Sequence, residues 1–239
     1  MVNVIFEIAK KETLSYYSLK SAYLRNGLFL ALFAFLTVSN ATSTIGKYGN
    51  TSTILTIALN ILMPMAAVFP VTMASGLSIM AFPAERDQKT LEHLLSLPIT
   101  DTEIFLGKFL AAVATGLGGL VLICIIIFGY LLLTTSIVWD GPLLTGPLTL
   151  MILAICPMLV VLLILTTVVI SSHISSRELY IVNIVSMFVL LYLNVAADSL
   201  KIDALTFNEG LAVVLAAAII GTYALGTRTF SREKLIKNI

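Results

Sequence analysis

The chain has 239 residues, of which 59% are hydrophobic and only 11% are charged. A soluble domain carries roughly 25% charged residues, so this composition excludes a soluble globular protein and predicts a membrane protein. The net charge of +1 gives no sign of a nucleic-acid partner, and we expect none.

Long stretches without Asp, Glu, Lys or Arg follow one another along the chain. About 20 residues of helix cross a bilayer core of about 30 Å, and backbone groups in lipid must be paired within the structure. The stretches lack the alternation of barrel strands. They therefore predict an all-α, polytopic membrane protein, with one domain over residues 1–239 and six transmembrane helices. The spans are expected at about 27–45, 54–82, 101–135, 147–171, 179–197 and 210–226.

Residues 1–25 predict an amphipathic helix that lies in the membrane interface. Its apolar face is interrupted only by Glu12, and lysines and an arginine lie among the apolar residues, as is typical of interfacial helices. The residues of that face are Ile5, Ile8, Tyr16, Leu19 and Tyr23.

Three prolines lie inside predicted spans: Pro64 and Pro70 in the second, and Pro157 in the fourth. Each proline removes a backbone donor and favours a bend in the helix. Bent spans often line cavities, but prolines are also simply frequent in membrane helices. Both interpretations, a kink beside a cavity and a neutral proline, remain open from the sequence.

A charged segment, residues 85–100, separates the second and third spans. Leu91, Leu94 and Leu95 share one helical face, and Pro98 ends the helix. A helix this short is marginal alone in water. It must therefore rest on the membrane surface, on the ends of the protein's own helices or on a partner.

The third span has a well-defined start. Thr100 and Glu103 have the spacing of a capping box, and Ile99 and Ile104 can form the accompanying hydrophobic staple. The same signature precedes the fifth and sixth spans, at Ser175 and Thr206. Small residues at helical spacing then predict a seam for helix packing or dimer formation. They are Ala112, Gly116 and Gly119.

The distribution of basic residues predicts the orientation of the chain. With both termini inside, twelve of the fourteen Lys and Arg residues lie on inner segments, and only Lys47 and Lys201 lie outside. Such an excess is the positive-inside pattern. We therefore expect an integral protein of the cell membrane with both termini in the cytoplasm.

The inventory of chemical groups argues against catalysis within the membrane. All acidic and basic residues lie outside the spans or at their ends, whereas ionisable residues at depth usually mark function. Gly107 and Lys108 are followed by Phe109, so they do not complete a phosphate-binding loop. We expect no catalytic residue, no metal site and no cofactor in this chain.

The charged segment and its flanks resemble the permease subunit of type-2 ABC exporters. The resemblance covers the cluster Glu85-Arg86-Asp87, the stretch TLEHLLSLPIT (90–100) and the stretch EIFLGKFLA (103–111). The predicted topology agrees over the whole chain. One departure is the segment 198–209 before the last span, where many members of the family have a longer re-entrant pair of helices.

The resemblance implies that the chain works with a separate cytosolic ATP-binding-cassette ATPase. Two permeases would form a homodimer or a heterodimer in the lipid membrane. Two ATPases, which bind ATP and Mg, would attach to this dimer from the cytosol. Residues 85–100 would be the coupling helix that fits a cleft of the ATPase, and residues 1–25 the connecting helix. The coupling residues implied are Glu85, Arg86, Lys89, Thr90, Leu91, Glu92, Leu94, Leu95, Leu97 and Pro98.

Three other interpretations remain. A haem-exporter-type permease has a similar length and a similar loop, but the predicted spans contain no midplane histidine. A membrane enzyme acting on lipid or peptide lacks acid and base groups at depth. A non-transporting scaffold for a cytosolic partner accounts for the loop but not for six spans with several prolines. For an exporter, a drug, a lipid, a peptide and a glycolipid all remain candidate substrates.

Overall fold

The computed structural model describes residues 2–48, 52–79, 100–134, 146–171 and 204–229, and helices make up nearly all of this part. The helices are α1 (Val2–Tyr17), α2 (Lys20–Tyr48), α3 (Ser52–Ile79), α6 (Asp101–Thr134), α7 (Gly146–Leu150), η2 (Met151–Ile155), α8 (Cys156–Ser171) and α10 (Ala204–Thr229). The all-α prediction is confirmed for these residues. The expected fifth span, 179–197, lies outside them.

Four of the described helices contain a segment that is long and apolar enough to cross a membrane. The segments are Lys20–Asn40 in α2, Thr102–Tyr130 in α6, Leu148–Ile170 from α7 to α8, and Leu205–Gly226 in α10. They coincide with the first, third, fourth and sixth predicted spans. At the second predicted span, α3 contributes a shorter apolar segment, Ala66–Ser78.

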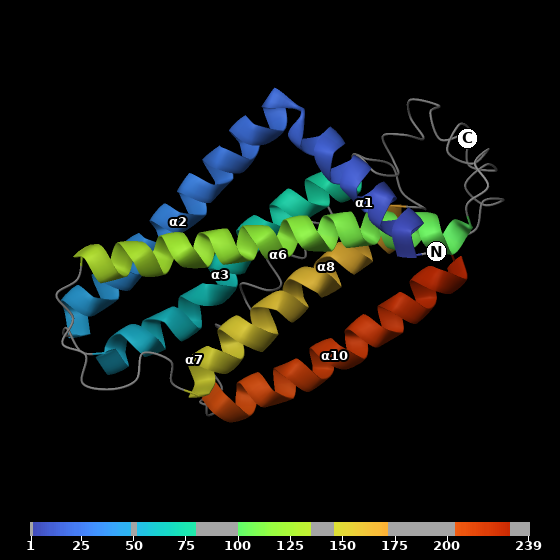
Figure 1. The fold of residues 1–239 in the computed structure, drawn as a ribbon. Coiled ribbons are helices and arrows are strands. Elements are labelled where there is room, and N and C mark those ends of the chain that lie inside the picture. Colours follow the sequence, from blue (N-terminus) through green and yellow to red (C-terminus); the bar gives the residue numbers. More distant parts are fainter. Residues whose placement is uncertain (1, 49–51, 80–99, 135–145, 172–203, 230–239) are drawn as a thin grey trace.

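Helix α3 lies at the centre of the bundle, where it packs against α2, α6 and α8 (Figure 1). Helix α10 packs mainly along α8 and leaves most of its own surface uncovered. Apolar side chains such as Leu28 and Phe35 of α2 and Val213 and Ile220 of α10 are exposed. Exposure of such apolar faces is unfavourable in water but not in a lipid bilayer.

The N-terminal helix differs from the expected 1–25 segment. Helix α1 ends at Tyr17, and Lys20 already belongs to α2, which continues as the first span. The chain turns at Ser18 and Leu19, where the Leu19 N–H donates to the Tyr16 carbonyl, three residues back, at 3.3 Å. The Ser18 hydroxyl donates to the Ser15 carbonyl at 2.7 Å in the same turn. The Leu19 carbonyl then accepts a bond from the Ala22 N–H, which starts the new helix.

The fourth span contains a π-helical turn, η2, directly before Pro157. The Cys156 N–H donates to the Met151 carbonyl, five residues back, where an α-helix would bond four residues back. A proline ring crowds the carbonyl four residues before it, and the wider π turn provides room there. In contrast, α3 continues as a helix through Pro64 and Pro70.

The start of the last span also differs from expectation. Helix α10 begins by Ala204, so Thr206 lies inside its first turn and is not the N-cap of a box with Glu209. The earlier start makes α10 longer than the expected span 210–226. The cap predicted at Ser175 lies outside the described residues.

Candidate functional site

The start of α6 is fixed by the capping box that the sequence predicts. The Thr100 N–H and hydroxyl both donate to Glu103 Oε2, at 2.9 and 2.8 Å, and the Glu103 N–H donates to Thr100 Oγ1 at 3.3 Å. These reciprocal bonds satisfy donors that a helix start leaves unpaired. The prediction of this helix start is confirmed. Segment 85–100 therefore leads directly into a helix with a defined first residue.

Two turns later, α6 holds α1 against its side. A side-chain carbon added at Gly107 would lie 2.7 Å from Ile8 Cγ2 and 3.1 Å from the Ile5 carbonyl oxygen. Only glycine allows the two helices to approach this closely. The face of α1 with Ile5 and Ile8 therefore packs on α6, although the sequence assigns it to the membrane interface. The side chains of Phe6 and Leu14 remain exposed.

An ion pair lies in the same contact. Lys108 Nζ is 3.7 Å from Glu12 Oε1, and the two side chains are 0% and 11% exposed. A buried charge is very unfavourable unless it is paired, and Glu12 of α1 lies within ion-pair distance of Lys108. Glu12, which interrupts the apolar face of α1 in the sequence, therefore faces a base of α6.

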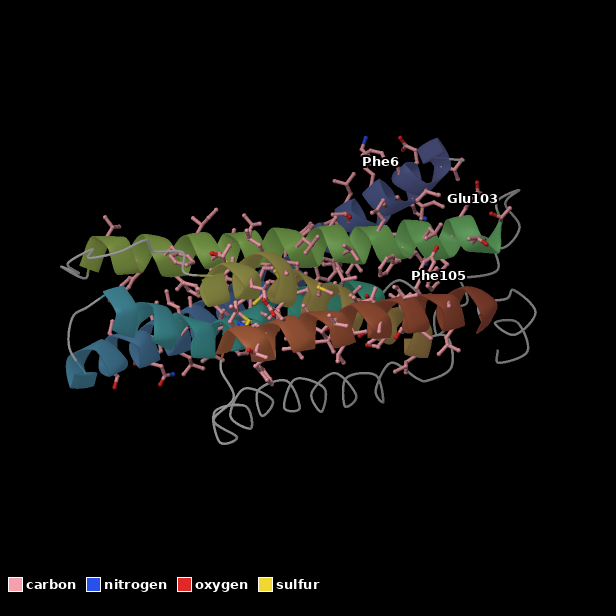
Figure 2. The ribbon with its side chains drawn as sticks, turned by 90° about the horizontal axis from the view of Figure 1, so that it is seen from below. Phe6, Glu103 and Phe105 are labelled. Carbon is pink, nitrogen blue, oxygen red and sulfur yellow. The ribbon has the colours of Figure 1, made fainter. Side chains whose placement is uncertain are left out.

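On the side of α6 away from α1, one side chain of its first turns reaches the last helix, α10. Phe105 is 1% exposed and projects from α6 toward α10 (Figure 2). A carbon added at Gly226 of α10 would lie 3.2 Å from Phe105 Cζ and 2.7 Å from Val169 Cγ2 of α8. The beginning of α6 thus packs along α1, and its Phe105 ring reaches the last described helix.

A polar cluster joins α1 to α2 at their junction. Arg25 Nη2 donates a hydrogen bond to the Tyr16 hydroxyl (2.9 Å). The Tyr16 hydroxyl in turn donates to Asn26 Oδ1 (3.2 Å). Gly76 of α3 makes room for the cluster, because a carbon added there would lie 2.7 Å from Arg25 Nη2. The angle between α1 and α2 in Figure 1 is therefore held by hydrogen bonds as well as by packing.

Sequence comparison adds the decisive observation. The profile of the family described as ABC-2 family transporter protein matches residues 15–202, from the end of α1 to just before α10. The chain belongs to the ABC-2 family of transporter proteins. No curated protein sequence matches it. As an ABC-2 protein with several apolar helices, it is an integral membrane protein and the membrane component of a transporter.

The predicted coupling residues of this ABC-2 protein lie outside the described residues, so their contacts stay a prediction. They are Glu85, Arg86, Lys89, Thr90, Leu91, Glu92, Leu94, Leu95, Leu97 and Pro98. The structure does describe the helix that follows this segment, α6, and its capped first turn. The family match includes the whole segment.

The predicted small-residue seam of the ABC-2 protein lies inside the subunit. A carbon added at Gly116 would lie 2.8 Å from Ile164 Cδ1 and 2.9 Å from Val160 Cγ1, both on α8. At Gly119 it would lie 3.1 Å from Met73 Sδ and 3.4 Å from Pro70 on α3. Ala112 is fully buried. These residues pack α6 onto α3 and α8.

The sequence did not predict the pairing of Glu12 with Lys108, nor the cluster at Tyr16. The signal for the first was present, since one acid interrupts an apolar face of α1 and one base follows the glycine of EIFLGKFLA. Nothing in the local pattern joined the two, because they are far apart in the chain and meet only after the helices pack.

Proposed function

We propose that this chain is the permease subunit of an ATP-binding-cassette exporter and forms its translocation path. The observation that carries the proposal is the family match over residues 15–202. A separate cytosolic ATPase would bind ATP and Mg and supply the energy, because the chain's own Gly107-Lys108 pair sits in a helix contact and does not form a phosphate-binding loop.

Segment 85–100 would act as the coupling helix on the ATPase. Its leucines would enter an apolar cleft, while Glu92 and Lys89 would fix the register at the rim. The packing around α6 supports this role. Because the first turns of α6 pack along α1, a push on the segment would move α6 and α1 together, and Phe105 would transmit part of it to α10. Helix α1 would accordingly serve as the connecting helix.

The working unit would contain two permeases and two ATPases. Each permease would have six spans, with the fifth over residues 179–197, and both termini in the cytoplasm of a cell-membrane protein. The positive-inside distribution of Lys and Arg supports this orientation. The permeases would form a homodimer or a heterodimer whose cavity carries the substrate.

Co-purification tests the proposal. The full chain, tagged at its C-terminus, is extracted from native membranes in mild detergent, and its stoichiometric partners are identified by mass spectrometry. We expect a soluble ATP-binding-cassette protein, and we expect Glu92→Arg or Leu94→Asp to lose it. Glu209→Arg is the matched control, because Glu209 is an exposed acid of α10, and it should keep the partner.

A chain that purifies only with itself, unchanged by Glu92→Arg, would contradict the coupling role. That result would favour the scaffold or enzyme interpretation. Retention of the ATPase together with loss of transport in Leu94→Asp would instead show that the segment transmits force without holding the partner.

A further inference from the structure

A cavity of about 500 Å³ lies where α1, α2, α3 and α6 meet. Figure 1 shows α1 and α2 diverging from their junction while α6 passes beside both. Among the described residues, those that line the cavity are Thr13, Tyr17, Asn26, Gly27, Leu30, Phe69, Met73, Ala114, Thr115, Gly118, Gly119 and Leu122. Most of this lining is apolar, and none of these side chains is charged.

Two polar atoms of the lining residues have no hydrogen-bond partner in the structure: Asn26 Nδ2 and Thr115 Oγ1. Asn26 is 8% exposed and Thr115 is 5% exposed. Buried polar groups in proteins are nearly always hydrogen-bonded, and an unpartnered one is unfavourable. Two such groups beside one cavity, on α2 and on α6, indicate a missing partner with hydrogen-bonding atoms.

The orientation of the Asn26 amide follows from its neighbours. Arg25 donates to the Tyr16 hydroxyl, so this hydroxyl has its own proton left to donate, and Asn26 Oδ1 is the acceptor. If the Asn26 amide were flipped, both Arg25 and the Asn26 NH₂ group would point donors at the Tyr16 oxygen. The Tyr16 hydroxyl proton would then have no acceptor. The Asn26 NH₂ group therefore remains as an unused donor.

We infer that this cavity binds an uncharged amphiphile whose ester, amide or hydroxyl oxygen accepts a hydrogen bond from Asn26 Nδ2 and pairs with the Thr115 hydroxyl. The volume lies in the range of sites for drug-sized ligands. The apolar body of the ligand contacts Leu30, Met73 and Leu122. The same chemistry belongs to the ester region of a membrane lipid and to a small amphiphile that the transporter carries.

Binding requires a small rearrangement, because both unpartnered atoms are covered by neighbouring groups in the structure. Threonine in a helix populates two side-chain rotamers, so Thr115 can turn its hydroxyl into the cavity. Met73 has a flexible side chain and can move aside. The ligand thus satisfies two groups that otherwise have no partner.

Photolabelling of the full chain in detergent, with any subunits that remain bound, tests this inference. The probe is a monoacylglycerol, which is uncharged and has one ester carbonyl, with a diazirine in its acyl chain. We expect adducts on peptides of α2, α3 and α6 that contain Leu30, Met73 or Leu122. Thr115→Val, which removes only the unpartnered hydroxyl, should reduce labelling roughly tenfold and should not lower the melting temperature.

Matched variants separate binding at this cavity from general effects. Thr37→Val removes a buried hydroxyl that already donates to the Phe33 carbonyl, and it should leave labelling unchanged. Gly118→Phe should abolish labelling, because a side chain added there meets open space beside the cavity. Gly129→Phe adds the same ring to open space further along α6 and should have no effect on labelling.

Competition distinguishes the two sources of the ligand. Suppression of labelling by excess phosphatidylcholine assigns the cavity to membrane lipid, whereas displacement by unlabelled monoolein alone assigns it to a small amphiphile. The inference would be overturned if no labelling occurred, or if labelling were unchanged in both Thr115→Val and Gly118→Phe. Adducts that cross-link a second copy of the chain through this face would also overturn it. The outcome does not depend on whether an ATPase co-purifies.

Discussion

Three neighbouring glycines of α6 have contrasting surroundings. At Gly116 and Gly119 the helix is pressed against α8 and α3, and an added carbon would lie 2.8 Å and 3.1 Å from its nearest neighbours. At Gly118 an added carbon would meet nothing within 4 Å. Because each helical residue turns the side-chain direction by about 100°, the three glycines differ: Gly116 faces the seam with α8, Gly118 faces open space, and Gly119 lies where the contact with α3 borders the cavity. The same residue type therefore serves close packing on one side and free space on the other.

Helix α6 is also tightly packed where it contacts α1. A substitution in this contact should have the largest effect on stability. Lys108→Met removes the buried base that lies 3.7 Å from Glu12 Oε1. Breaking such a pair costs about 3–5 kcal/mol, so the contact of α1 with α6 should weaken and α1 should open more often. The measurement is tryptic cleavage after Lys10 and Lys11, which are exposed on α1, together with the melting temperature in detergent.

The double variant Glu12→Leu with Lys108→Met is the control for this prediction. It replaces both charges by apolar groups, which is often nearly neutral for a buried pair. Recovery of protease resistance in the double variant would confirm the pairing. A Lys108→Met chain as resistant as the parent would show that packing at Gly107 and the hydrogen bonds at Tyr16 hold α1 without the ion pair.

The helices of this contact could be predicted from the sequence because their signals are local. A run of apolar residues defines α6, and the spacing of Thr100 and Glu103 defines its start. In contrast, the break between α1 and α2 falls at Ser18 and Leu19, where no proline or glycine marks it in the sequence. No hydrophobic periodicity reports such a break, so the expected helix extended too far, to residue 25.

The candidate site was less predictable than the fold because its parts meet only through packing. The glycines of α6 were predicted as a seam, but which of them faces which neighbour depends on the rotation of α6 in the bundle. Glu12 and Lys108 each looked like a charge at a helix surface or end. Their pairing requires α1 to lie on α6 rather than on the lipid interface, and that placement has no local signature.

The seam at Gly116 provides the second prediction. Gly116→Leu inserts a side chain where even the first carbon would lie 2.8 Å from Ile164 Cδ1 and 2.9 Å from Val160 Cγ1. Overpacking of this kind destabilises a protein by typically about 1–3 kcal/mol. We expect a lower melting temperature and a lower yield of monodisperse protein. Gly129→Leu, in open space on the same helix, should behave like the parent.

The open side of α6 predicts a smaller effect of the opposite sign. Gly118→Ala adds a methyl group that meets no described atom within 4 Å, so it brings no clash. Alanine in a helix is favoured over glycine by about 0.5–1 kcal/mol. The melting temperature should therefore rise. A fall would show that a segment outside the described residues covers this face of α6.

The smallest effect should be that of Gly119→Ala, where two contributions oppose each other. The added methyl group would lie 3.1 Å from Met73 Sδ and 3.4 Å from Pro70, and the flexible methionine can shift while the ring of Pro70 is already at ordinary contact distance. The gain in helix propensity, about 0.5–1 kcal/mol, then offsets a small packing cost. We expect a net change within about 0.5 kcal/mol by thermal unfolding. A loss of stability as large as that of Gly116→Leu would mean that the Met73 side chain is held rigidly. Met73, which lies between Gly119 and the cavity, could then not move aside for a ligand.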